Sequence, residues 1–396
     1  MVRWIDREIS DTLLQAARTR PALVVSGARQ TGKTSLVRRL FPTHSYVSLD
    51  LPAKAEQAER DPDAFFAAHP PPVVIDEVQY APSVFRSIKR DIDAHRQHYG
   101  RFVLTGSQRY VLMKEVGDSL AGRASLFDLP PLSYREIKGS IGDVSTLDVI
   151  VRGGYPELWE NPGLDATEFY AAYVATYLER DVRNLLQVGN LRDFDRFIRA
   201  SALRSANVTN KSELARDVGI AASTANQWLS VLEAADQVLM LEPWFNNRTR
   251  SMTKSPKLYL GDTGLLCALL GVREQDDLLR TPSIGAIWES FVFNELRKRH
   301  RLARPSQSIF YWRDRNAEVD FILHRAGRFE TLEAKWSDTS AQLTRGMHAF
   351  ESHVKAEVQH RIVTRTQASR KVDGVAVVGP DDAWFDGDQS SSTGNP

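Results

Sequence analysis

The chain has 396 residues, a length that favours two or three domains over a single compact core. Its 51 basic and 50 acidic residues give a net charge of +1, which excludes a global field that draws the chain onto nucleic acid or membrane. The single cysteine, Cys267, excludes an intramolecular disulfide and a cysteine-based metal cluster. With a charged start and no apolar run of membrane-spanning length, we expect a cytoplasmic protein without membrane contact.

Residues 1–150 alternate short β-branched runs with longer polar stretches, which is the pattern of a parallel sheet covered by helices. The expected strands are Ala22–Ser26, Ser45–Leu49, Pro72–Asp76, Arg101–Thr105 and Ala124–Asp128. Four of these runs carry no charge at their inward positions, as expected for strands that are buried on both faces. The sequence therefore predicts an α/β domain at this end of the chain.

A phosphate-binding loop follows the first expected strand. Residues 27–34 match the pattern G-x-x-x-x-G-K-[ST] and lie between a strand and a helix, the context that this motif requires. Its glycines let the backbone N–H groups surround a phosphate, Lys33 would reach the β and γ oxygens, and Thr34 would ligate Mg²⁺. The predicted ATP-binding residues are Gly27, Ala28, Arg29, Gln30, Thr31, Gly32, Lys33, Thr34 and Ser35. The alternative is a glycine-rich turn before a surface helix.

A second motif weakens that alternative. Asp76 and Glu77 end an apolar strand downstream of the loop, so that Asp76 is expected to hold Mg²⁺ and Glu77 to act as the general base. Thr105 and Ser107 end a neighbouring strand, where they would either sense the γ-phosphate or simply cap a turn.

Arginines are expected because the charge on a transferred phosphoryl group needs neutralisation. Arg123 is the first candidate for this catalytic role, and Arg180 is the second. Surface solvation is the alternative for both. If Arg123 acts on the phosphoryl group, its replacement by alanine abolishes turnover while nucleotide binding persists.

Residues 151–280 are expected to be mostly helical. The stretch from Lys211 to Leu232 has the spacing of a helix-turn-helix, broken at Gly219 and capped again at Ser223. The residues predicted to face outward are Thr224, Asn226, Gln227 and Ser230. Two strands follow, joined by a basic loop that contains Arg248, Arg250 and Lys254 and ends at Lys257. The pattern indicates a winged helix whose cations contact DNA phosphates, or else a winged helix used for packing or oligomerisation.

Residues 281–380 contain charged side chains at the ends of apolar runs. A helix carries Glu289, a strand carries Asp320, and the next strand of the hairpin carries Glu333 and Lys335. This order resembles the PD-(D/E)xK nuclease core, which implies that Glu289, Asp320 and Glu333 hold a divalent metal and that Lys335 is catalytic. The alternative is a surface charge cluster. The basic run 297–301 would either contact phosphates or solvate a helix end, and residues 381–396 are expected to form a disordered acidic tail.

Several motifs together resemble one protein family. They are residues 27–34, Val73–Gln79, Leu104–Gln108, Leu129–Glu136 and the Gly-Gly-Tyr-Pro-Glu run 153–157. The chain resembles the bacterial and archaeal AAA-type ATPases that carry a C-terminal domain of unknown function. The resemblance covers nearly all of the chain before the tail and implies a P-loop ATPase, a winged-helix region and a domain with the restriction-endonuclease fold.

The sequence therefore predicts an ATP-hydrolysing protein that couples its nucleotide state to a DNA-directed effector, in the first place a metal-dependent nuclease. The alternative is an ATP-switched binding or signalling protein whose nuclease-like domain is inactive and serves assembly. ATP and Mg²⁺ are the expected cofactors, with Mn²⁺ as an option at the nuclease-like site. DNA is the expected partner, and assembly into a homo-oligomer is a further expectation.

Overall fold

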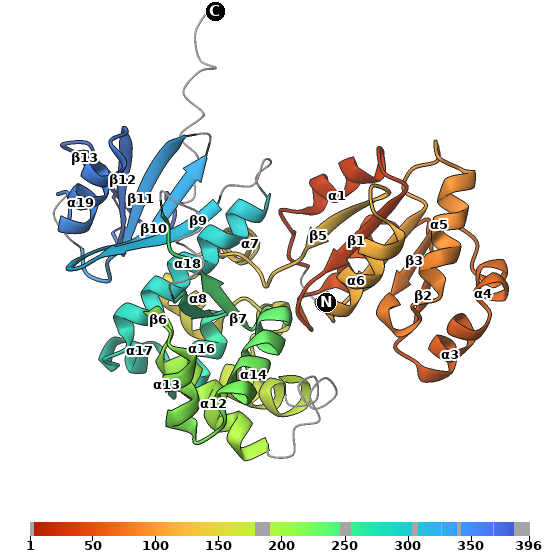
Figure 1. Ribbon diagram of the computed structural model, residues 1–396, viewed down its shortest axis with the longest axis horizontal. Coiled ribbons are helices and arrows are strands. Elements are labelled where there is room, and N and C mark those ends of the chain that lie inside the picture. Colours follow the sequence, from red (N-terminus) through yellow and green to blue (C-terminus); the bar gives the residue numbers. More distant parts are fainter. Residues whose placement is uncertain are drawn as a thin grey trace, which may run out of the picture.

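The computed structural model describes residues 4–178, 191–245, 255–302, 308–325, 327–338, 342–366 and 368–383. Figure 1 shows an α/β module at the N-terminal end, a mainly helical region after it, and a C-terminal module built around a second large sheet. Several residues singled out from the sequence lie outside the described residues, namely Arg180, Arg248, Arg250, Lys254 and the stretch 384–396.

The N-terminal module is a five-stranded parallel sheet in the order β2-β3-β4-β1-β5, and it confirms the predicted α/β P-loop fold. Its strands are β1 (Ala22–Ser26), β2 (Ser45–Ser48), β3 (Val73–Asp76), β4 (Phe102–Gly106) and β5 (Ala124–Asp128). Its helices are α1 (Ser10–Ala17), α2 (Lys33–Leu40), α3 (Pro52–Arg60), α4 (Pro62–Ala68), the 3₁₀ turn η1 (Val78–Tyr80), α5 (Val84–Ala94) and α6 (Arg109–Ser119). The three central strands β1, β3 and β4 are buried at every position, because helices cover both faces of the sheet.

The register of this sheet brings the predicted phosphate-site residues to one edge. Ser26, the residue before the loop, pairs with Gly106, and Asp76 pairs with Ser48. The carboxyl ends of β1, β3 and β4 therefore lie side by side, which is where ligands bind in open parallel sheets.

The middle region contains a helix pair and a small antiparallel sheet of order β6-β8-β7, whose strand β6 precedes the pair in the chain. Its elements are α7 (Tyr134–Ile141), α8 (Thr146–Arg152), α9 (Pro156–Glu160), α10 (Ala166–Tyr173), the π-helical turn η2 (Val174–Leu178), α12 (Leu191–Leu203), β6 (Asn207–Val208), α13 (Lys211–Val218), α14 (Ala222–Ala234), β7 (Val238–Leu241), β8 (Lys257–Leu260), α16 (Thr263–Leu270) and α17 (Gln275–Arg280). Gly219 ends α13 with a φ of 81°, as expected. The predicted cap at Ser223 is wrong, because α14 already begins at Ala222 after an extended Ala221.

The C-terminal module is a six-stranded mixed sheet in the order β13-β14-β12-β11-β10-β9. Its elements are α18 (Ile284–Leu302), β9 (Ser308–Asp314), β10 (Ala317–Arg325), β11 (Arg328–Ala334), α19 (Arg345–Val354), β12 (Val358–Val363), β13 (Arg370–Val372) and β14 (Val375–Val378). The hairpin of β10 and β11 pairs Phe321 with Leu332, so Asp320 and Glu333 lie opposite each other in the register.

One hydrophobic core runs through the middle region and into the C-terminal module. It includes Tyr134 and Ile150 from the short helices after β5, Leu265 from α16, and Trp288 from α18. The helices α7 and α8, which the predicted boundary at residue 150 assigns to the ATPase domain, thus pack their apolar side chains with the regions that follow. Among the helices formed by the described residues, none is long and apolar enough to cross a membrane.

The beginning of the predicted tail is folded. Asp381 accepts hydrogen bonds from the Lys138 ammonium at 2.6 Å and from the Tyr134 hydroxyl at 3.2 Å. Ala383 is buried, and its carbonyl accepts a hydrogen bond from Arg361 at 2.8 Å. The expectation of a tail that is disordered from residue 381 is therefore wrong for its first three residues, since these contacts tie them to both α7 and β12.

Candidate nucleotide site and acidic centre

The phosphate loop lines a cavity of about 560 Å³ at the carboxyl ends of the parallel strands. Its lining residues come from the N-terminal segment, the phosphate loop and the start of α2, the end of β3, the segment after β5, and α9: Trp4, Ile5, Arg7, Arg29, Gln30, Gly32, Lys33, Thr34, Ser35, Glu77, Leu132, Pro156, Glu157 and Glu160. The structure thus brings most of the predicted ATP-binding residues together around one cavity. It also closes that cavity with residues from the middle region.

Lys33 is buried at the start of α2. Its ammonium donates to the carbonyl oxygens of Gly27 at 2.9 Å and Ala28 at 2.8 Å, so the loop holds its own cation. Burial lowers the pKa of Lys33 to about 8, although the nearby carboxylates of Glu77 and Asp76 act in the opposite direction. The charged form of Lys33 is therefore destabilised by the loss of hydration, and an anion bound in the cavity would stabilise it.

The lowered pKa of Lys33 leads to a prediction for ATP binding. At pH 8, about half of the Lys33 side chains are neutral, and the phosphates of ATP will raise the pKa and protonate them. Binding of ATP with Mg²⁺ is expected to take up about half a proton at pH 8 and almost none at pH 6.5. Calorimetric titration in two buffers of different ionisation enthalpy measures this uptake. Equal uptake at the two pH values would contradict the assignment to Lys33.

Asp76 collects hydroxyl groups from three elements. Its carboxylate accepts hydrogen bonds from Thr34 at 2.9 Å, from Tyr46 at 2.9 Å and from Thr105. Burial, followed by the charge of Asp76, raises the pKa of Tyr46 to about 12, so the phenol remains a donor. The Thr34 hydroxyl and the Asp76 carboxylate are hard oxygen ligands side by side, a donor set that fits Mg²⁺.

Glu77 faces the cavity from a strained position. Its φ of 54° lies in the left-handed region, which non-glycine residues rarely adopt and which recurs at functional sites. The carboxylate accepts hydrogen bonds from the Ser107 backbone N–H at 3.1 Å and from the Ser107 hydroxyl at 2.8 Å, and Gln79 donates a further one. Burial alone would raise the pKa of Glu77, but Lys33 and these donors outweigh it and hold the pKa below its usual range.

Arg123 lies at the other end of the sheet. It precedes β5, whose first residue Ala124 pairs with Ala22 at the amino end of β1. Its guanidinium donates to the Asp93 carboxylate at 2.9 and 3.1 Å. The structure therefore does not bring Arg123 to the phosphate loop of its own chain, because the full length of β1 separates them. Arg29, which belongs to the loop itself, lines the cavity instead.

The far wall of the cavity is the start of α9, where Pro156 follows the Gly-Gly-Tyr run. A Cβ built on Gly32 would lie 3.7 Å from Cγ of Pro156, so this proline sits directly over the loop. Gly154 accepts a hydrogen bond from the Leu132 N–H at 2.6 Å, and a Cβ on Gly154 would come within 2.6 Å of the Leu132 carbonyl oxygen. Only glycine permits this close backbone contact. This run is one of the motifs on which the family resemblance depends. Nothing in its local sequence indicates that Pro156 faces a loop more than a hundred residues away.

Asp262 anchors this wall. It is buried, it caps α16 by accepting from the Leu265 N–H at 3.0 Å, and it also accepts from the Gly154 N–H at 2.8 Å and the Tyr170 hydroxyl at 2.7 Å. One carboxylate thus joins a helix start in the middle region to the backbone that positions Pro156.

Replacing Asp262 by alanine leaves two or more buried donors without acceptors. We expect the free energy of unfolding to fall by roughly 3 kcal/mol and ATP affinity to fall with it. Asp165→Ala is the matched control, because Asp165 is an exposed cap that, among the described residues, accepts a hydrogen bond from the Glu168 N–H alone. Denaturant unfolding and ATP titration of both variants check this. Equal losses in the two variants would show that Asp262 acts as a simple helix cap.

The N-terminal segment supplies a buried arginine that sequence reasoning missed. Arg7 donates to the Thr31 carbonyl at 2.8 Å, to the Pro130 carbonyl at 2.6 Å and to the Glu136 carboxylate at 3.1 Å. It therefore ties the phosphate loop to the segment after β5. An isolated arginine in a charged N-terminus carries no sequence signal for such a role.

The predicted acidic residues of the C-terminal module, Glu289, Asp320 and Glu333, lie at a second, separate site. Glu318, which was not predicted, joins them there, and we call these four residues the acidic centre. Asp320 accepts a hydrogen bond from the Ala334 N–H at 3.0 Å. Glu333 accepts from Thr344 at 2.9 Å and pairs with Lys335 at 2.6 Å. Asp320 and Glu333 are only 9% and 3% exposed, so the alternative of a surface charge cluster is wrong for these two residues.

Lys257 reaches the acidic centre from β8. Its ammonium lies 3.0 Å from Glu289, 2.6 Å from Glu318 and 3.7 Å from Asp320. The prediction that Lys257 belongs to a solvent-facing basic wing is therefore wrong, since its side chain is 2% exposed and points into the C-terminal module.

The carboxylates around Lys257 are strongly perturbed. Burial, followed by Asp320, raises the pKa of Glu289 to about 7, and burial together with Asp320 also raises the pKa of Glu333. Among the described residues, no three acidic, histidine or cysteine side chains are grouped so that they could hold a metal ion. Of the predicted metal ligands, Glu289 and Asp320 thus both face the Lys257 ammonium, whereas Glu333 pairs with Lys335.

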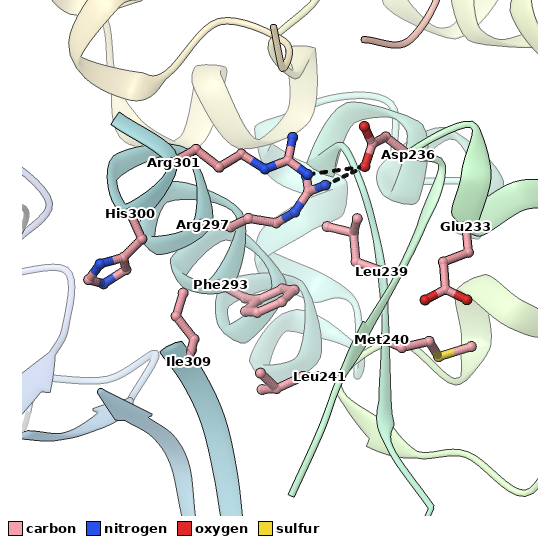
Figure 2. A pocket seen from close by; sticks show the side chains of 10 residues that line it. All are labelled: Glu233, Asp236, Leu239, Met240, Leu241, Phe293, Arg297, His300, Arg301 and Ile309. Atoms are coloured by element: carbon pink, nitrogen blue, oxygen red, sulfur yellow. Dashed lines mark hydrogen bonds and ion pairs between the residues drawn. The ribbon is translucent and has the colours of Figure 1, made fainter. Parts of the chain in front are cut away.

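The basic end of α18 is occupied by contacts between regions. Figure 2 shows Arg297 and Arg301 both reaching Asp236, beside a pocket of about 360 Å³ that Phe293 also lines. Arg301 also pairs with Asp128 at the end of β5. The charges of these two arginines are paired with carboxylates of the neighbouring regions. The two arginines therefore form neither a solvated helix end nor a phosphate-contacting run.

Comparison with known proteins gives three family models along the chain. An AAA domain matches residues 19–138, a domain of unknown function (DUF8612) matches residues 145–276, and a further domain of unknown function (DUF4143) matches residues 284–380. A similar solved structure is the Walker-type ATPase PABY2304 of Pyrococcus abyssi, which is 16% identical, covers 67% of this chain and 96% of its own, and has a TM-score of 0.48.

Two curated relatives are the uncharacterized protein Rv2008c of Mycobacterium tuberculosis and the uncharacterized protein Mb2031c of Mycobacterium bovis. Each is 31% identical over 349 residues, which cover 87% of this chain and 76% of the relative. The chain therefore belongs to the family of these two mycobacterial proteins, and its first module is a P-loop ATPase of the AAA type.

Proposed function

We propose that this protein is an ATP-driven switch in which helix α18 transmits the nucleotide state of the first module to the C-terminal module. The observation that carries the proposal is that α18 is bonded at one end to the wall of the nucleotide cavity and at the other to the acidic centre and the C-terminal sheet.

The contact with the nucleotide module lies in the second half of α18. The Lys298 ammonium donates to the Leu132 carbonyl at 2.8 Å and to Glu295 at 2.8 Å. Glu295 in turn accepts from the Tyr134 N–H at 2.9 Å. Since Leu132 itself lines the nucleotide cavity, a ligand that shifts this segment acts directly on α18.

The contact with the C-terminal module lies in the first half of the same helix. The Trp288 indole N–H donates to the Val363 carbonyl at the end of β12, at 3.2 Å, and Glu289 lies in the acidic centre. A helix of 19 residues moves as a rigid body more readily than it bends. Displacement at Leu132 is therefore expected to reach β12 and the acidic centre.

For hydrolysis, Lys33 would bind the β and γ oxygens of ATP, and Thr34 and Asp76 would hold Mg²⁺, which would neutralise charge on the phosphates. Glu77 acts as the general base that orients the attacking water. Support for this role comes from its position in the cavity and its lowered pKa, which keeps it ionised. Ser107 holds the Glu77 carboxylate in place through hydrogen bonds from its backbone N–H and its hydroxyl.

We further propose that the middle region is a winged helix. The order α12, β6, α13, α14, β7, β8 supports this, as does the exposure of Asn226, Gln227 and Ser230 on α14. Contact with DNA phosphates through Arg248, Arg250 and Lys254 remains part of this proposal. Binding that weakens steeply with salt, and loses that dependence in Arg248→Ala/Arg250→Ala, is the expected result.

A metal-dependent nuclease is the second candidate function. It is favoured by Asp320 and Glu333 lying opposite each other on β10 and β11, with Lys335 paired to Glu333. We propose a restriction-endonuclease-like fold for this module on the same grounds.

One experiment separates the two candidate functions. DNA is incubated with the full chain over a series of Mg²⁺ or Mn²⁺ concentrations, with and without ATP, while phosphate release is measured in parallel. The switch predicts ATP hydrolysis without DNA cleavage. Cleavage that disappears in Asp320→Ala and Lys335→Ala would establish the nuclease instead, and a chain that releases no phosphate would contradict the switch.

A further inference from the structure

The acidic centre contains a cation that belongs to another region of the same chain. Lys257 starts β8 in the three-stranded sheet of the middle region, whereas its three carboxylate partners belong to α18 and β10. The Lys257 side chain is 2% exposed, and its ammonium lies 5.7 Å from the centre of the Tyr311 ring. Lys257 is thus a buried cation that the middle region inserts among carboxylates of the C-terminal module.

This insertion is held by backbone contacts between the two sheets. The Trp244 N–H donates to the Tyr311 carbonyl at 2.7 Å, and the Tyr311 N–H donates to the Glu242 carbonyl at 3.1 Å. The Tyr311 hydroxyl donates to the Ser255 carbonyl, two residues before Lys257, at 2.6 Å. The residues just before the lysine and the end of β7, where Leu241 pairs with Lys257, are therefore fixed to β9, so the position of the lysine follows from the docking of the sheets.

The charges around the ammonium are not balanced by it. Glu289, Glu318 and Asp320 contribute up to three negative charges; Lys257 contacts all three, and the charge of Lys335 acts from a greater distance on Asp320 and Glu289. Arg313 is 3.6 Å from Glu318 and more than half exposed, so it offsets only the outermost of them. Tyr259 donates to Glu289 at 2.7 Å without adding charge. Asp320 is buried and Glu289 and Glu318 are partly buried, so the three carboxylates together need a nearby cation, and a divalent ion would neutralise more of their charge than an ammonium.

We infer that the acidic centre is a cation site whose resident cation is the ammonium of Lys257, which excludes a divalent metal ion from Glu289, Glu318 and Asp320. The lysine takes the position of the metal and locks the C-terminal module onto the middle region. This inference goes beyond the proposed switch and does not depend on nucleotide hydrolysis.

The test uses the nucleotide-free full chain titrated with Mn²⁺, with free Mn²⁺ measured by electron paramagnetic resonance. The wild-type chain is expected to bind no Mn²⁺ at this site. Lys257→Met is expected to bind about one Mn²⁺ per chain, with an affinity raised at least about tenfold. The double variant Lys257→Met/Glu289→Gln removes one ligand and is expected to lose the gained site.

Lys138→Met is the matched control. Lys138 also pairs closely with a carboxylate, that of Asp381, but this pair lies outside the acidic centre and involves one carboxylate only. Its loss is expected to create no Mn²⁺ site. A gain equal to that of Lys257→Met would show that removal of any paired lysine exposes a weak metal site, and would overturn the inference.

Two further results would overturn it. The first is Mn²⁺ binding by the wild-type chain that disappears in Asp320→Asn, since the carboxylates would then accept a metal with Lys257 in place. The second is a folded Lys257→Met chain that binds no Mn²⁺. If this variant unfolds in metal-free buffer, circular dichroism follows its refolding as Mn²⁺ is added: recovery supports the inference, and absence of recovery counts against it. ATP hydrolysis is not read out, so either outcome leaves the switch to its own test.

Discussion

Replacing Glu77 by glutamine is expected to reduce ATP turnover by about 10² to 10⁴-fold while ATP still binds. The amide keeps the shape of the carboxylate and can still contact Ser107, but it cannot accept a proton from the attacking water. Lys33, Thr34 and the loop backbone are untouched by this change, so the phosphates retain their ligands. Phosphate release under single-turnover conditions measures the chemical step, and calorimetry measures binding.

Two further variants make this result specific. Asp63→Asn removes an exposed carboxylate of the same module, paired with Arg90 on the surface, and is expected to leave turnover unchanged. Lys33→Ala is expected to lose ATP binding as well as turnover, because the buried ammonium next to the cavity disappears. Turnover in Glu77→Gln within a few-fold of the wild-type rate would remove Glu77 from the catalytic role.

Replacing Glu295 by alanine is expected to lower the free energy of unfolding by roughly 3 kcal/mol. The change leaves the Tyr134 N–H without its acceptor and the buried Lys298 ammonium without its carboxylate. Denaturant unfolding measures the loss. Glu295→Gln keeps an acceptor for Tyr134 and is expected to lose less, while Glu295→Ala/Lys298→Ala removes both charges and is expected to lose less than the sum of the two single variants.

The Glu295→Ala variant also distinguishes a loss of stability from a loss of signal transmission through α18. If α18 carries the nucleotide signal, Glu295→Ala will still bind and hydrolyse ATP, because no atom of Glu295 lines the nucleotide cavity. Its C-terminal module will no longer respond to ATP. A response of wild-type size in this variant would show that the signal bypasses the contact between Glu295 and Tyr134.

The sheet and the phosphate loop could be predicted because their signals are local. Gly27, Gly32 and Lys33 fall within one motif, and the strand before them is apolar from Ala22 to Val25 and buried at every position. The parallel order of the strands then brings Asp76 to the loop without any further information. Pro156 was visible as part of a motif, but its place over Gly32 depends on the packing of the middle region against the first module.

The role of Lys257 could not be predicted for a related reason. In sequence it follows three basic residues, and a run of cations between two strands is typical of a wing. Its actual partners, Glu289 and Glu318, lie 32 and 61 positions further along the chain, and only the docking of two sheets brings them together. Arg301 was misread in the same way, because a basic helix end looks solvated until Asp128 and Asp236 are seen beside it.

Hydrogen exchange in the presence of ATP tests the central claim most directly. The Glu77→Gln chain, which holds ATP without consuming it, is compared with and without ATP and Mg²⁺. We predict changed amide exchange at three places: the segment around Leu132, helix α18, and strands β10 to β12 near the acidic centre. A change confined to the phosphate loop and the other walls of the nucleotide cavity, with α18 and the C-terminal sheet unaffected, would contradict the switch.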